Sequence, residues 1–286
     1  VDSIGYLYSQ ITEYLGFKPH RHEGKVTGLA AYGNANKTLK LFEKLMVFKE
    51  GNFISNLGFY RPFTSPSNEL AKELKKFSKE DIAAGLQTHC ESLVSSYIRY
   101  WIKKMGYNSK NICLAGGVAA NVRINQVISN IKGVDNIYVF PHMGDGGIPL
   151  GAAAYLNYNT SGKAKLKFDT AQLGIEYSDI DIMTKLQKYK KLLIIEKPKN
   201  YVDAVIEDLI NAKVIGWFQG RMEFGPRALG GRSIIGDPRS SQMQSVMNLK
   251  IKYRESFRPF APSVRAEKVA DWFEQDSPSP YMLMVA

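Results

Sequence analysis

Residues 111–121 read Asn-Ile-Cys-Leu-Ala-Gly-Gly-Val-Ala-Ala-Asn, a short apolar run that stops at two glycines. Helical spacing of apolar residues resumes over 118–131. The same order returns downstream, with an apolar run at 136–140, a glycine-rich turn at 141–147 and a predicted helix of small residues at 149–155. Strand, glycine turn and helix, repeated in this way, predict an α/β layered unit.

Further elements are predicted around this unit. Ser78-x-x-Asp81 has the form of a capping box and opens a long amphipathic helix that runs to about residue 105. Residues 157–170 hold few apolar side chains and are interpreted as a linker. The other predicted elements are helices at 4–17, 34–48 and 202–212, short strands within 53–63, and a strand at 214–218.

Length and composition narrow the class of protein. The chain has 286 residues, of which 44% are hydrophobic and 23% charged. These values fit one large or two ordinary globular domains and exclude disordered, collagen-like and disulfide-scaffold proteins. No run approaches the ~18 apolar residues of a spanning helix, and no signal-peptide pattern opens the chain.

The cysteines and the chain ends add two expectations. Cys90 and Cys113 stand in apolar contexts and are predicted to be core residues, which favours a reducing compartment, the cytoplasm. Val1 lies inside a helical pattern and Ala286 inside an apolar run. We therefore expect a piece of a longer protein.

Positive charge is concentrated in one segment. The formal net charge is +11, and residues 221–268 hold ten Lys/Arg, most of them arginine, against four acidic residues. Such clustering predicts an anionic ligand, either nucleic acid or small phosphates. Arginine favours planar, bidentate binding of phosphate or carboxylate over diffuse attraction.

The two glycine turns are candidate nucleotide sites. At Gly116 and Gly117 the backbone can approach a phosphate without interference from Cβ atoms, and Asn121 can hydrogen-bond a ribose or phosphate. Asp145 lies in the second turn, and turns at the carboxyl ends of adjacent parallel strands face the same crevice. Its carboxylate suits a metal ion whose shell is completed by phosphate. The alternative, that Asp145 only caps the helix that follows, stays open.

The most unusual segment is 217–233, Trp-Phe-Gln-Gly-Arg-Met-Glu-Phe-Gly-Pro-Arg-Ala-Leu-Gly-Gly-Arg-Ser. Its three arginines stand among glycines and a proline, so the backbone is restricted and the guanidinium groups are predicted to point into a shared volume. In segment 248–262, two prolines restrict the backbone beside Arg258. The alternative is a solvated surface with an Arg/Glu salt-bridge network.

Together these strings resemble the O-carbamoyltransferase family, which includes nodulation-factor and antibiotic-tailoring enzymes. The strings that carry the resemblance follow the family's order along nearly the whole chain: 24–33, 114–121, 144–147, 221–233 and 252–262. Glu-Phe-Gly-Pro-Arg-Ala-Leu-Gly, at 223–230, is the most specific of them. The resemblance implies half of an actin-like (RNase H-like) domain, residues 1–168, followed by a partial YrdC-like α/β domain, residues 169–286.

The resemblance also implies the chemistry. The YrdC-like domain would form carbamoyl adenylate and pyrophosphate from ATP and carbamoyl phosphate. The actin-like domain would then transfer the carbamoyl group to a hydroxyl of a sugar-like or natural-product acceptor, leaving AMP. The expected partners are these small molecules, without membrane or nucleic acid, and a homodimer is compatible with the sequence.

Site residues follow from the family pattern, position by position. Arg227, Lys252 and Arg258 would contact carbamoyl phosphate and the ATP phosphates, with Ser233 as a hydroxyl ligand. The second-rank phosphate ligands are Arg221, Arg232 and Arg254, and Glu223 would orient an arginine. The predicted nucleotide ligands are Lys25, Gly116, Gly117, Asn121 and Gly146, and Asp145 matches the metal-ligand aspartate.

The metal site departs from the family pattern. That site also takes two histidines one helical turn apart, whereas His20 and His22 are two residues apart and cannot share a helical face. A divalent metal (iron, zinc or magnesium) is therefore expected only with histidines from outside this fragment. The isolated fragment is expected to bind nucleotide poorly and to lack transferase activity.

Two alternatives stay open. A tRNA threonylcarbamoyl-transfer enzyme would share the 116–121 string and the basic character. A non-catalytic nucleotide- or polyanion-binding protein would use the same basic segments, although aromatic residues do not alternate with the basic ones as stacking platforms would.

Overall fold

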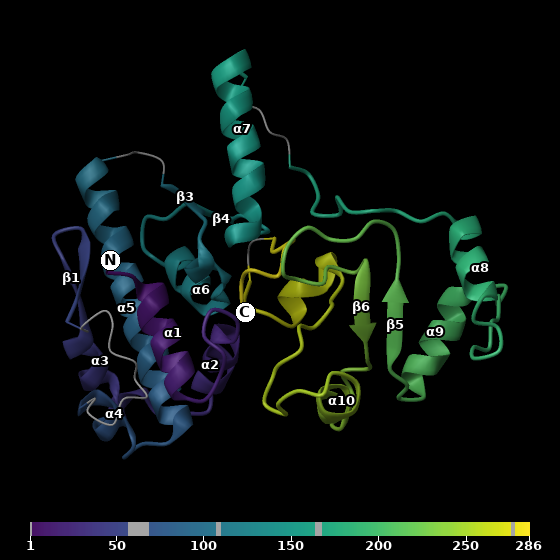
Figure 1. The fold of residues 1–286 in the computed structure, drawn as a ribbon, viewed down its shortest axis with the longest axis horizontal. Coiled ribbons are helices and arrows are strands. Elements are labelled where there is room, and N and C mark those ends of the chain that lie inside the picture. Colours follow the sequence, from purple (N-terminus) through teal and green to yellow (C-terminus); the bar gives the residue numbers. More distant parts are fainter. Residues whose placement is uncertain (1, 57–68, 107–109, 164–167, 276–277) are drawn as a thin grey trace.

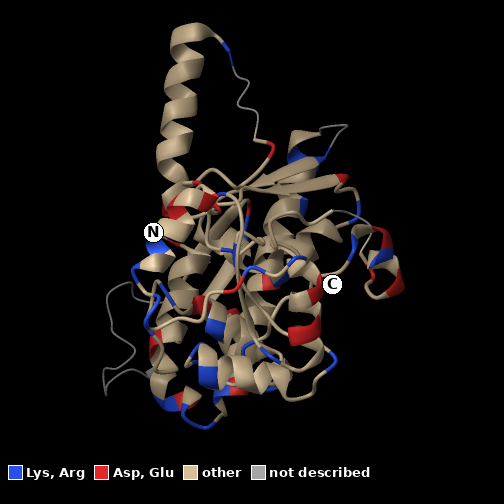
Figure 2. Ribbon diagram, turned by 90° about the vertical axis from the view of Figure 1, so that its right-hand side faces the viewer, with Lys and Arg blue, Asp and Glu red and all other residues tan. Residues whose placement is uncertain are grey.

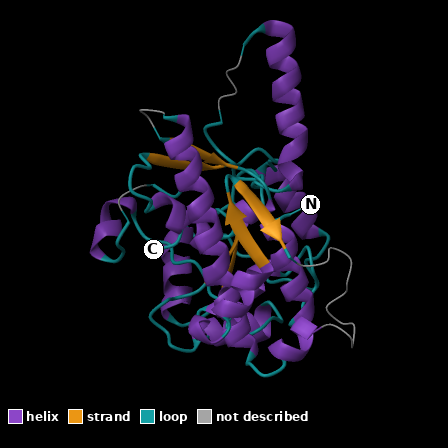
Figure 3. Ribbon diagram, turned by 90° about the vertical axis from the view of Figure 1, so that its left-hand side faces the viewer, coloured by secondary structure: helices purple, strands orange, loops and turns teal. Residues whose placement is uncertain are grey.

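The computed structural model describes residues 2–56, 69–106, 110–163, 168–275 and 278–286. Figure 1 shows two lobes side by side, one formed by the elements up to β4 and the other by those from α8 onward, with helix α7 projecting from the region between them. The described strands form three two-stranded sheets, and helices make up most of the regular structure (Figure 3). The prediction of a mixed α/β chain is confirmed at this level.

Helix α5 (Lys79–Met105) is the central helix of the first lobe. The Ser78 hydroxyl accepts the Asp81 N–H at its start, as predicted, and Gly106 ends it in the left-handed conformation. The Asp81 carboxylate also accepts the Asn34 N–H and the Lys37 ammonium. The other helices of the lobe are α1 (Ile4–Tyr14), α2 (Glu23–Ala30), α3 (Leu39–Leu45), α4 (Glu69–Leu74) and α6 (Val122–Ser129).

One hydrophobic core lies between these helices. Each contributes the apolar stripe of its sequence, and the side chains that are at most 1% exposed include Leu7, Ile11, Val26, Phe42 and Leu86. Burying such a side chain stabilises the fold by about 1.5–3 kcal/mol. The first lobe is therefore a rigid support for the turns at its edge.

Those turns follow the strands β3 (Asn111–Leu114) and β4 (Asn136–Val139), which pair in parallel with Ile112 opposite Ile137. β3 leads through a 3-10 turn (Gly117–Ala120) into α6, and β4 leads through a second 3-10 turn (Asp145–Gly147) into α7 (Ile148–Ser161). The Gly116 N–H donates to the Met143 carbonyl at 2.6 Å and joins the two turns. The predicted strand–turn–helix repeat is confirmed.

Two predicted boundaries were wrong. The helix predicted for 34–48 stops at Leu45, because Met46–Lys49 forms strand β1, paired with β2 (Asn52–Ser55) across a tight turn in which Glu50 and Gly51 both have positive φ. The linker predicted for 157–170 starts too early, since α7 continues to Ser161 before Gly162 ends it. Of the strands predicted within 53–63, the part from 57 onward lies outside the described residues.

Cys113 was predicted to be a core residue and is exposed, whereas Cys90 is buried as expected. Side chains alternate along β3, and Ile112 and Leu114 occupy the side that packs on the core. Cys113 lies on the opposite side of the strand, which is exposed.

The second lobe is smaller and more open. Strands β5 (Ile215–Phe218) and β6 (Arg232–Ile235) pair antiparallel with Phe218 opposite Arg232. The helices are α8 (Asp179–Gln187), α9 (Tyr201–Ile210) and α10 (Met243–Val246), the last continued by a π-helical turn (Met247–Ile251). No residue of α7, α8 or α9 is buried, and α7 carries no charged side chain (Figure 2). No helix among the described residues combines the length and the apolar character needed to cross a bilayer.

Candidate functional site

Strings from the two halves of the chain meet where the two lobes touch. The Phe224 ring lies 5.1 Å from the His142 ring and 6.2 Å from the Phe140 ring, centroid to centroid, at the end of β4. Gly225 has φ +124°, and a Cβ atom there would lie 2.7 Å from the Pro141 carbonyl oxygen. The 223–230 string therefore packs directly against the second glycine turn, at a distance that only glycine allows.

Arg227 extends from this string to the first lobe. Its Nη2 donates to the Ala120 carbonyl at 3.1 Å, within the turn that precedes α6. Its Nε is buried and has no hydrogen-bond partner among the described residues. Burial, and then the charge of Arg258, lower the pKa of the Arg227 guanidinium. A partly buried cation next to a second cation calls for a counter-charge.

The segment that carries Arg258 is arranged around the fully buried amide of Asn248. Its Nδ2 donates to two carbonyls, with the Arg258 oxygen at 2.9 Å, and its Oδ1 accepts Arg254 Nε at 2.6 Å. Burial and the charge of Arg258 lower the pKa of Arg254 as well. Two of the predicted phosphate ligands, Arg227 and Arg254, thus each lie within electrostatic reach of a third, Arg258.

Glu223 orders the main chain of the arginine loop. Its Oε1 accepts the N–H groups of Leu229, Gly231 and Arg232 at 2.9, 2.6 and 3.2 Å. Burial by itself raises the pKa of Glu223, but these N–H groups outweigh it and the pKa lies below its ordinary value. The carboxylate is thereby held as an acceptor, which fixes the loop beside Arg227.

The remaining predicted phosphate ligands are not gathered with these three. The Arg232 guanidinium donates to the Gln219 and Gly220 carbonyls and lies 3.5 Å from the Phe218 ring centroid. Arg221 forms an exposed ion pair with Glu176, Lys252 is exposed, and the Ser233 hydroxyl accepts the Gly230 N–H. Other basic residues of the cluster form local, exposed ion pairs: Arg239 with Asp237, Arg265 with Glu267, and Lys268 with Asp271. Lysine and arginine accordingly appear across both lobes in Figure 2.

Lys25, predicted to contact nucleotide, binds Glu255 of the second lobe. The Lys25 Nζ lies 2.7 Å from Glu255 Oε1, and the two side chains are 14% and 27% exposed. A Cβ on Gly28, one turn further along α2, would lie 3.8 Å from the Pro259 ring, an ordinary van der Waals distance. Helix α2 therefore contacts the segment that carries Arg258.

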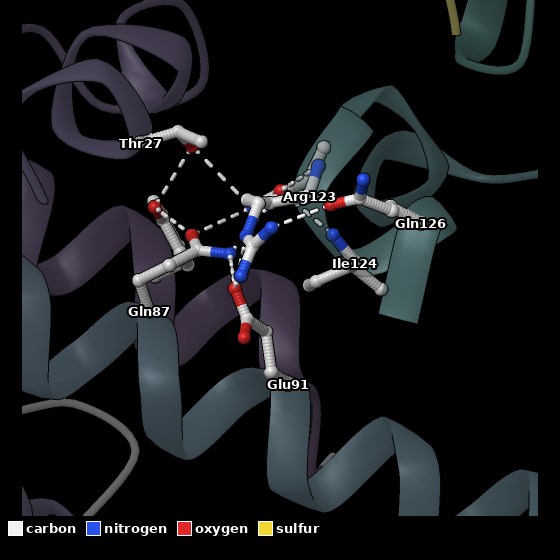
Figure 4. Close-up of polar contacts among 8 residues, drawn as sticks. Thr27, Gln87, Glu91, Arg123, Ile124 and Gln126 are labelled. Atoms are coloured by element: carbon white, nitrogen blue, oxygen red, sulfur yellow. Dashed lines mark hydrogen bonds and ion pairs between the residues drawn. The ribbon is translucent and has the colours of Figure 1, made fainter. Parts of the chain in front are cut away.

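Asn121, which follows the first glycine turn, joins residues of three helices into a polar network through its side-chain amide, and Figure 4 shows its partners Thr27, Gln87 and Ile124 around it. Its Oδ1 accepts the N–H groups of Arg123 and Ile124 and so caps α6. Its Nδ2 donates to Gln87 Oε1 at 2.9 Å and to Thr27 Oγ1 at 3.3 Å. These bonds use the capacity of the amide and fix the turn that presents the Ala120 carbonyl.

The network continues into α1 and along α5. The Tyr8 hydroxyl donates to Gln87 Oε1 at 2.8 Å, and Gln87 Nε2 donates to Glu91 at 2.9 Å. Glu91 in turn lies 3.6 Å from Arg123 Nε, so the interactions link α5 to α6. Burial raises the pKa of the Tyr8 hydroxyl, which therefore stays protonated as a donor.

The glycines of the two turns differ in their surroundings. A Cβ on Gly116 or Gly117 would meet no atom of the described residues within 4 Å, which leaves that space open to a ligand. A Cβ on Gly146 would lie 2.0 Å from His142 Nε2. Gly146 therefore serves the packing of the His142 ring.

The described residues do not fit a metal site by themselves. Asp145 is exposed in the 3-10 turn before α7, and the described part of the chain contains no group of three His, Cys, Asp or Glu side chains that could hold an ion. The nearby His142 has its Nδ1 buried. One exposed carboxylate leaves most of a divalent cation's coordination shell unfilled.

Several residues of the junction were missed in the sequence. Gln87 was not predicted, although a glutamine on the apolar side of a long helix is a usable signal. Glu255 is the acid inside the second basic segment, and Asn248 is a polar residue that the fold buries completely. Ala120 contributes only its main-chain oxygen, and side-chain patterns carry no information on such acceptors.

Comparison with known proteins identifies the family of the chain. Residues 1–154 match the family model described as carbamoyltransferase N-terminus, and residues 206–286 match carbamoyltransferase C-terminus. An uncharacterized protein of Synechocystis sp. is 41% identical over 99% of this chain and 49% of its own length. The nodulation protein NolO of Bradyrhizobium diazoefficiens is 32% identical over 96% of this chain and 50% of its own length. The nodulation protein NolNO of Sinorhizobium fredii is 34% identical over 96% of this chain and 40% of its own length. The chain spans half or less of the length of these relatives. Because the N-terminal family model matches more than half of the chain, the chain belongs to the carbamoyltransferase family.

Proposed function

We propose that the protein makes carbamoyl adenylate from ATP and carbamoyl phosphate and transfers the carbamoyl group to a hydroxyl of a small-molecule acceptor. In balanced form, carbamoyl phosphate and water give carbamate and inorganic phosphate. A carbamate oxygen attacks the α-phosphorus of ATP and expels pyrophosphate. The acceptor hydroxyl then attacks the carbonyl carbon, the bond to the AMP oxygen breaks, and the hydroxyl proton leaves to solvent.

The observation that carries this proposal is the pair of partly buried guanidinium groups at the junction. Among the described residues, neither Arg227 nor Arg258 forms an ion pair with a carboxylate, and Arg227 Nε has no hydrogen-bond partner. Each of the two small-molecule substrates carries phosphate, whose planar O–P–O faces suit guanidinium forks. The pair would offset the charge of phosphates that otherwise repel one another.

The placement of the two arginines supports different roles for the two lobes, with adenylate formation in the second and carbamoyl transfer in the first. Arg227 and Arg258 belong to the second lobe, proposed to be the adenylate-forming, YrdC-like part. The open backbone at Gly116 and Gly117 belongs to the first, proposed to be half of an actin-like fold. Arg227 connects the two lobes, because its guanidinium donates to the Ala120 carbonyl of the first lobe. An adenylate formed beside Arg227 would therefore lie close to the turn proposed to receive it.

The test is pyrophosphate release by the full-length gene product. Pyrophosphate is expected only when ATP and carbamoyl phosphate are both present, and mass spectrometry is expected to find a mass gain of one carbamoyl group on one member of a panel of hydroxylated acceptors. Arg227→Met is expected to reduce release at least tenfold, because one charge-assisted contact contributes about 1.5–3 kcal/mol. Arg239→Met, which removes an exposed arginine paired with Asp237, is the matched control.

Two results would contradict the proposal. Pyrophosphate release that does not depend on carbamoyl phosphate would indicate a different nucleotide reaction. Binding of nucleic acid that falls steeply with salt, without any release of pyrophosphate, would favour a polyanion-binding protein.

A further inference from the structure

Glu255 stands between cations from both lobes. Its Oε1 accepts Lys25 Nζ of helix α2 at 2.7 Å. Its Oε2 is buried and has no hydrogen-bond partner among the described residues. One half of this carboxylate is therefore held by the first lobe, while the other half is available to a second donor.

Arg258 is the neighbour that could become this second donor. Residues 255–258 form a tight turn in which the Arg258 N–H donates to the Glu255 carbonyl at 3.3 Å, so the two side chains start from the same turn. Burial by itself raises the pKa of Glu255, but the bond from Lys25 and the charges of Lys25 and Arg258 keep it below its ordinary value. The carboxylate thus stays ionised within the electrostatic reach of Arg258.

We infer that Lys25 is a positioning residue, which holds the Glu255 carboxylate away from Arg258 and so keeps that guanidinium free to bind a phosphate. The inference rests on the proposed function only for the identity of the anion. It gives Lys25 a different role from the direct nucleotide contact expected from the sequence. Helix α2 would therefore act on the anion site without touching the ligand.

The physical basis is a competition for one carboxylate. With Lys25 in place, Glu255 is oriented by a charge-assisted bond to an ammonium that is largely shielded from water. Without Lys25, a mostly buried carboxylate would lose its partner, and leaving such a charge unpaired is costly. Rotation toward Arg258 would pair it again, and the anion would then have to displace an internal carboxylate before it could bind.

A double-mutant cycle on the full-length gene product tests this, with inorganic pyrophosphate as the probe in isothermal titration calorimetry. Lys25→Met is expected to weaken pyrophosphate binding about tenfold, the equivalent of one charge-assisted contact. Glu255→Gln alone is expected to change binding less than twofold, because Lys25 already holds the carboxylate. In the Lys25→Met background, the same Glu255→Gln change is expected to restore binding to within about twofold of wild type.

The non-additivity separates this idea from simpler ones. If Lys25 acted only through its charge, Glu255→Gln would tighten binding by the same factor in both backgrounds, and that result would overturn the inference. If Lys25 served only to hold the lobes together, Glu255→Gln would not rescue the Lys25 variant, which would overturn it too. Lys37→Met, which breaks an ion pair of equal length with Asp81, within the first lobe, is the control for folding, and thermal unfolding is recorded for every variant.

Failure of the proposed function would look different. If the mutant cycle shows the expected coupling in pyrophosphate binding, while the wild-type protein forms no pyrophosphate from ATP and carbamoyl phosphate, the proposed reaction is refuted and the positioning role is supported. A protein that catalyses the reaction with additive Lys25 and Glu255 effects would do the opposite. Absence of pyrophosphate binding by the wild-type protein would refute the positioning role.

Discussion

Gly225 is the position at which the contact between the lobes can be tested most directly. It has φ +124°, and an added Cβ would lie 2.7 Å from the Pro141 carbonyl oxygen, closer than real Cβ atoms come to such an atom. Gly225→Ala therefore introduces two separate costs. One is the backbone conformation, which L residues rarely adopt, and the other is the overlap with the first lobe.

Gly230 separates these two costs. It also has a positive φ, +101°, but a Cβ there would meet nothing within 4 Å in the described part of the chain. Gly230→Ala is therefore destabilised by backbone strain alone, by about 1–3 kcal/mol. In Gly225→Ala the Cβ must also move from 2.7 to about 3.4 Å, the start of ordinary contact, so the arginine loop must shift by about 0.7 Å relative to Pro141. A misplacement of about 1 Å can reduce a rate about 100-fold.

The expected result is a difference between the two variants in activity rather than in stability. Pyrophosphate release by Gly225→Ala is expected to fall about 10- to 100-fold below that of Gly230→Ala, because only the first displaces Arg227 from the Ala120 carbonyl. The melting temperatures of both should drop by several degrees, at about 2–4 °C per kcal/mol for a chain of this size. The assays are coupled pyrophosphate detection and differential scanning calorimetry.

Equal activities for Gly225→Ala and Gly230→Ala would refute the reasoning. That outcome would mean that the approach of the loop to Pro141 does not set the position of Arg227. A fall in activity that is matched by loss of folded protein would be recognised by calorimetry and corrected for.

Three further predictions concern the first lobe. The bonds from Lys37 and Asn34 lower the pKa of Asp81 to about 2, from 3.8, so the carboxylate stabilises the fold above pH 3.8 and loses this effect as the pH falls toward 2. In acid titration followed by circular dichroism, the difference in stability between wild type and Asp81→Asn should therefore disappear over that interval. A difference that does not depend on pH would contradict the prediction. Tyr8→Phe removes the hydroxyl that contacts Gln87 and Thr27. We expect it to lower the free energy of unfolding, measured by urea titration, by about 1–2 kcal/mol. No change would show that water replaces the hydrogen bonds of the lost hydroxyl. Cys113 is exposed and Cys90 is buried, and burial raises the pKa of Cys90, so one thiol should react with a disulfide reagent in the native state and the second only on unfolding.

How far the sequence predicts this structure depends on the range of the interactions involved. The long helix beginning at Lys79 and the repeat of strand, turn and helix follow from local patterns, apolar spacing and a serine cap, and both are confirmed. The first strand of the hairpin, Met46–Lys49, was predicted as helix because the helical spacing of the residues before it continues into the strand, and only the pairing with the second strand distinguishes the two.

The candidate site was predictable in part for a similar reason. Arginines on restricted, glycine- and proline-rich segments indicate anion binding, and Arg227 and Arg254 each do lie within electrostatic reach of Arg258. Which arginines remain free could not be predicted, because Arg232 is used by carbonyls of its own hairpin and Arg221 by Glu176. The partners of Lys25 and Asn121 come from segments that are distant in the sequence, so no local pattern predicts them.

Two of the contacts across the junction use main-chain oxygens as acceptors, and this has an evolutionary consequence. Arg227 binds the carbonyl of Ala120, and Asn125 binds that of Leu283. Every amino acid supplies such an oxygen, so positions 120 and 283 can exchange side chains of similar size without loss of the bond. Substitution should therefore be slow at the donors, Arg227 and Asn125, and faster at positions 120 and 283, which only accept. Distant homologues would then keep the same packing of the two lobes while their sequences diverge.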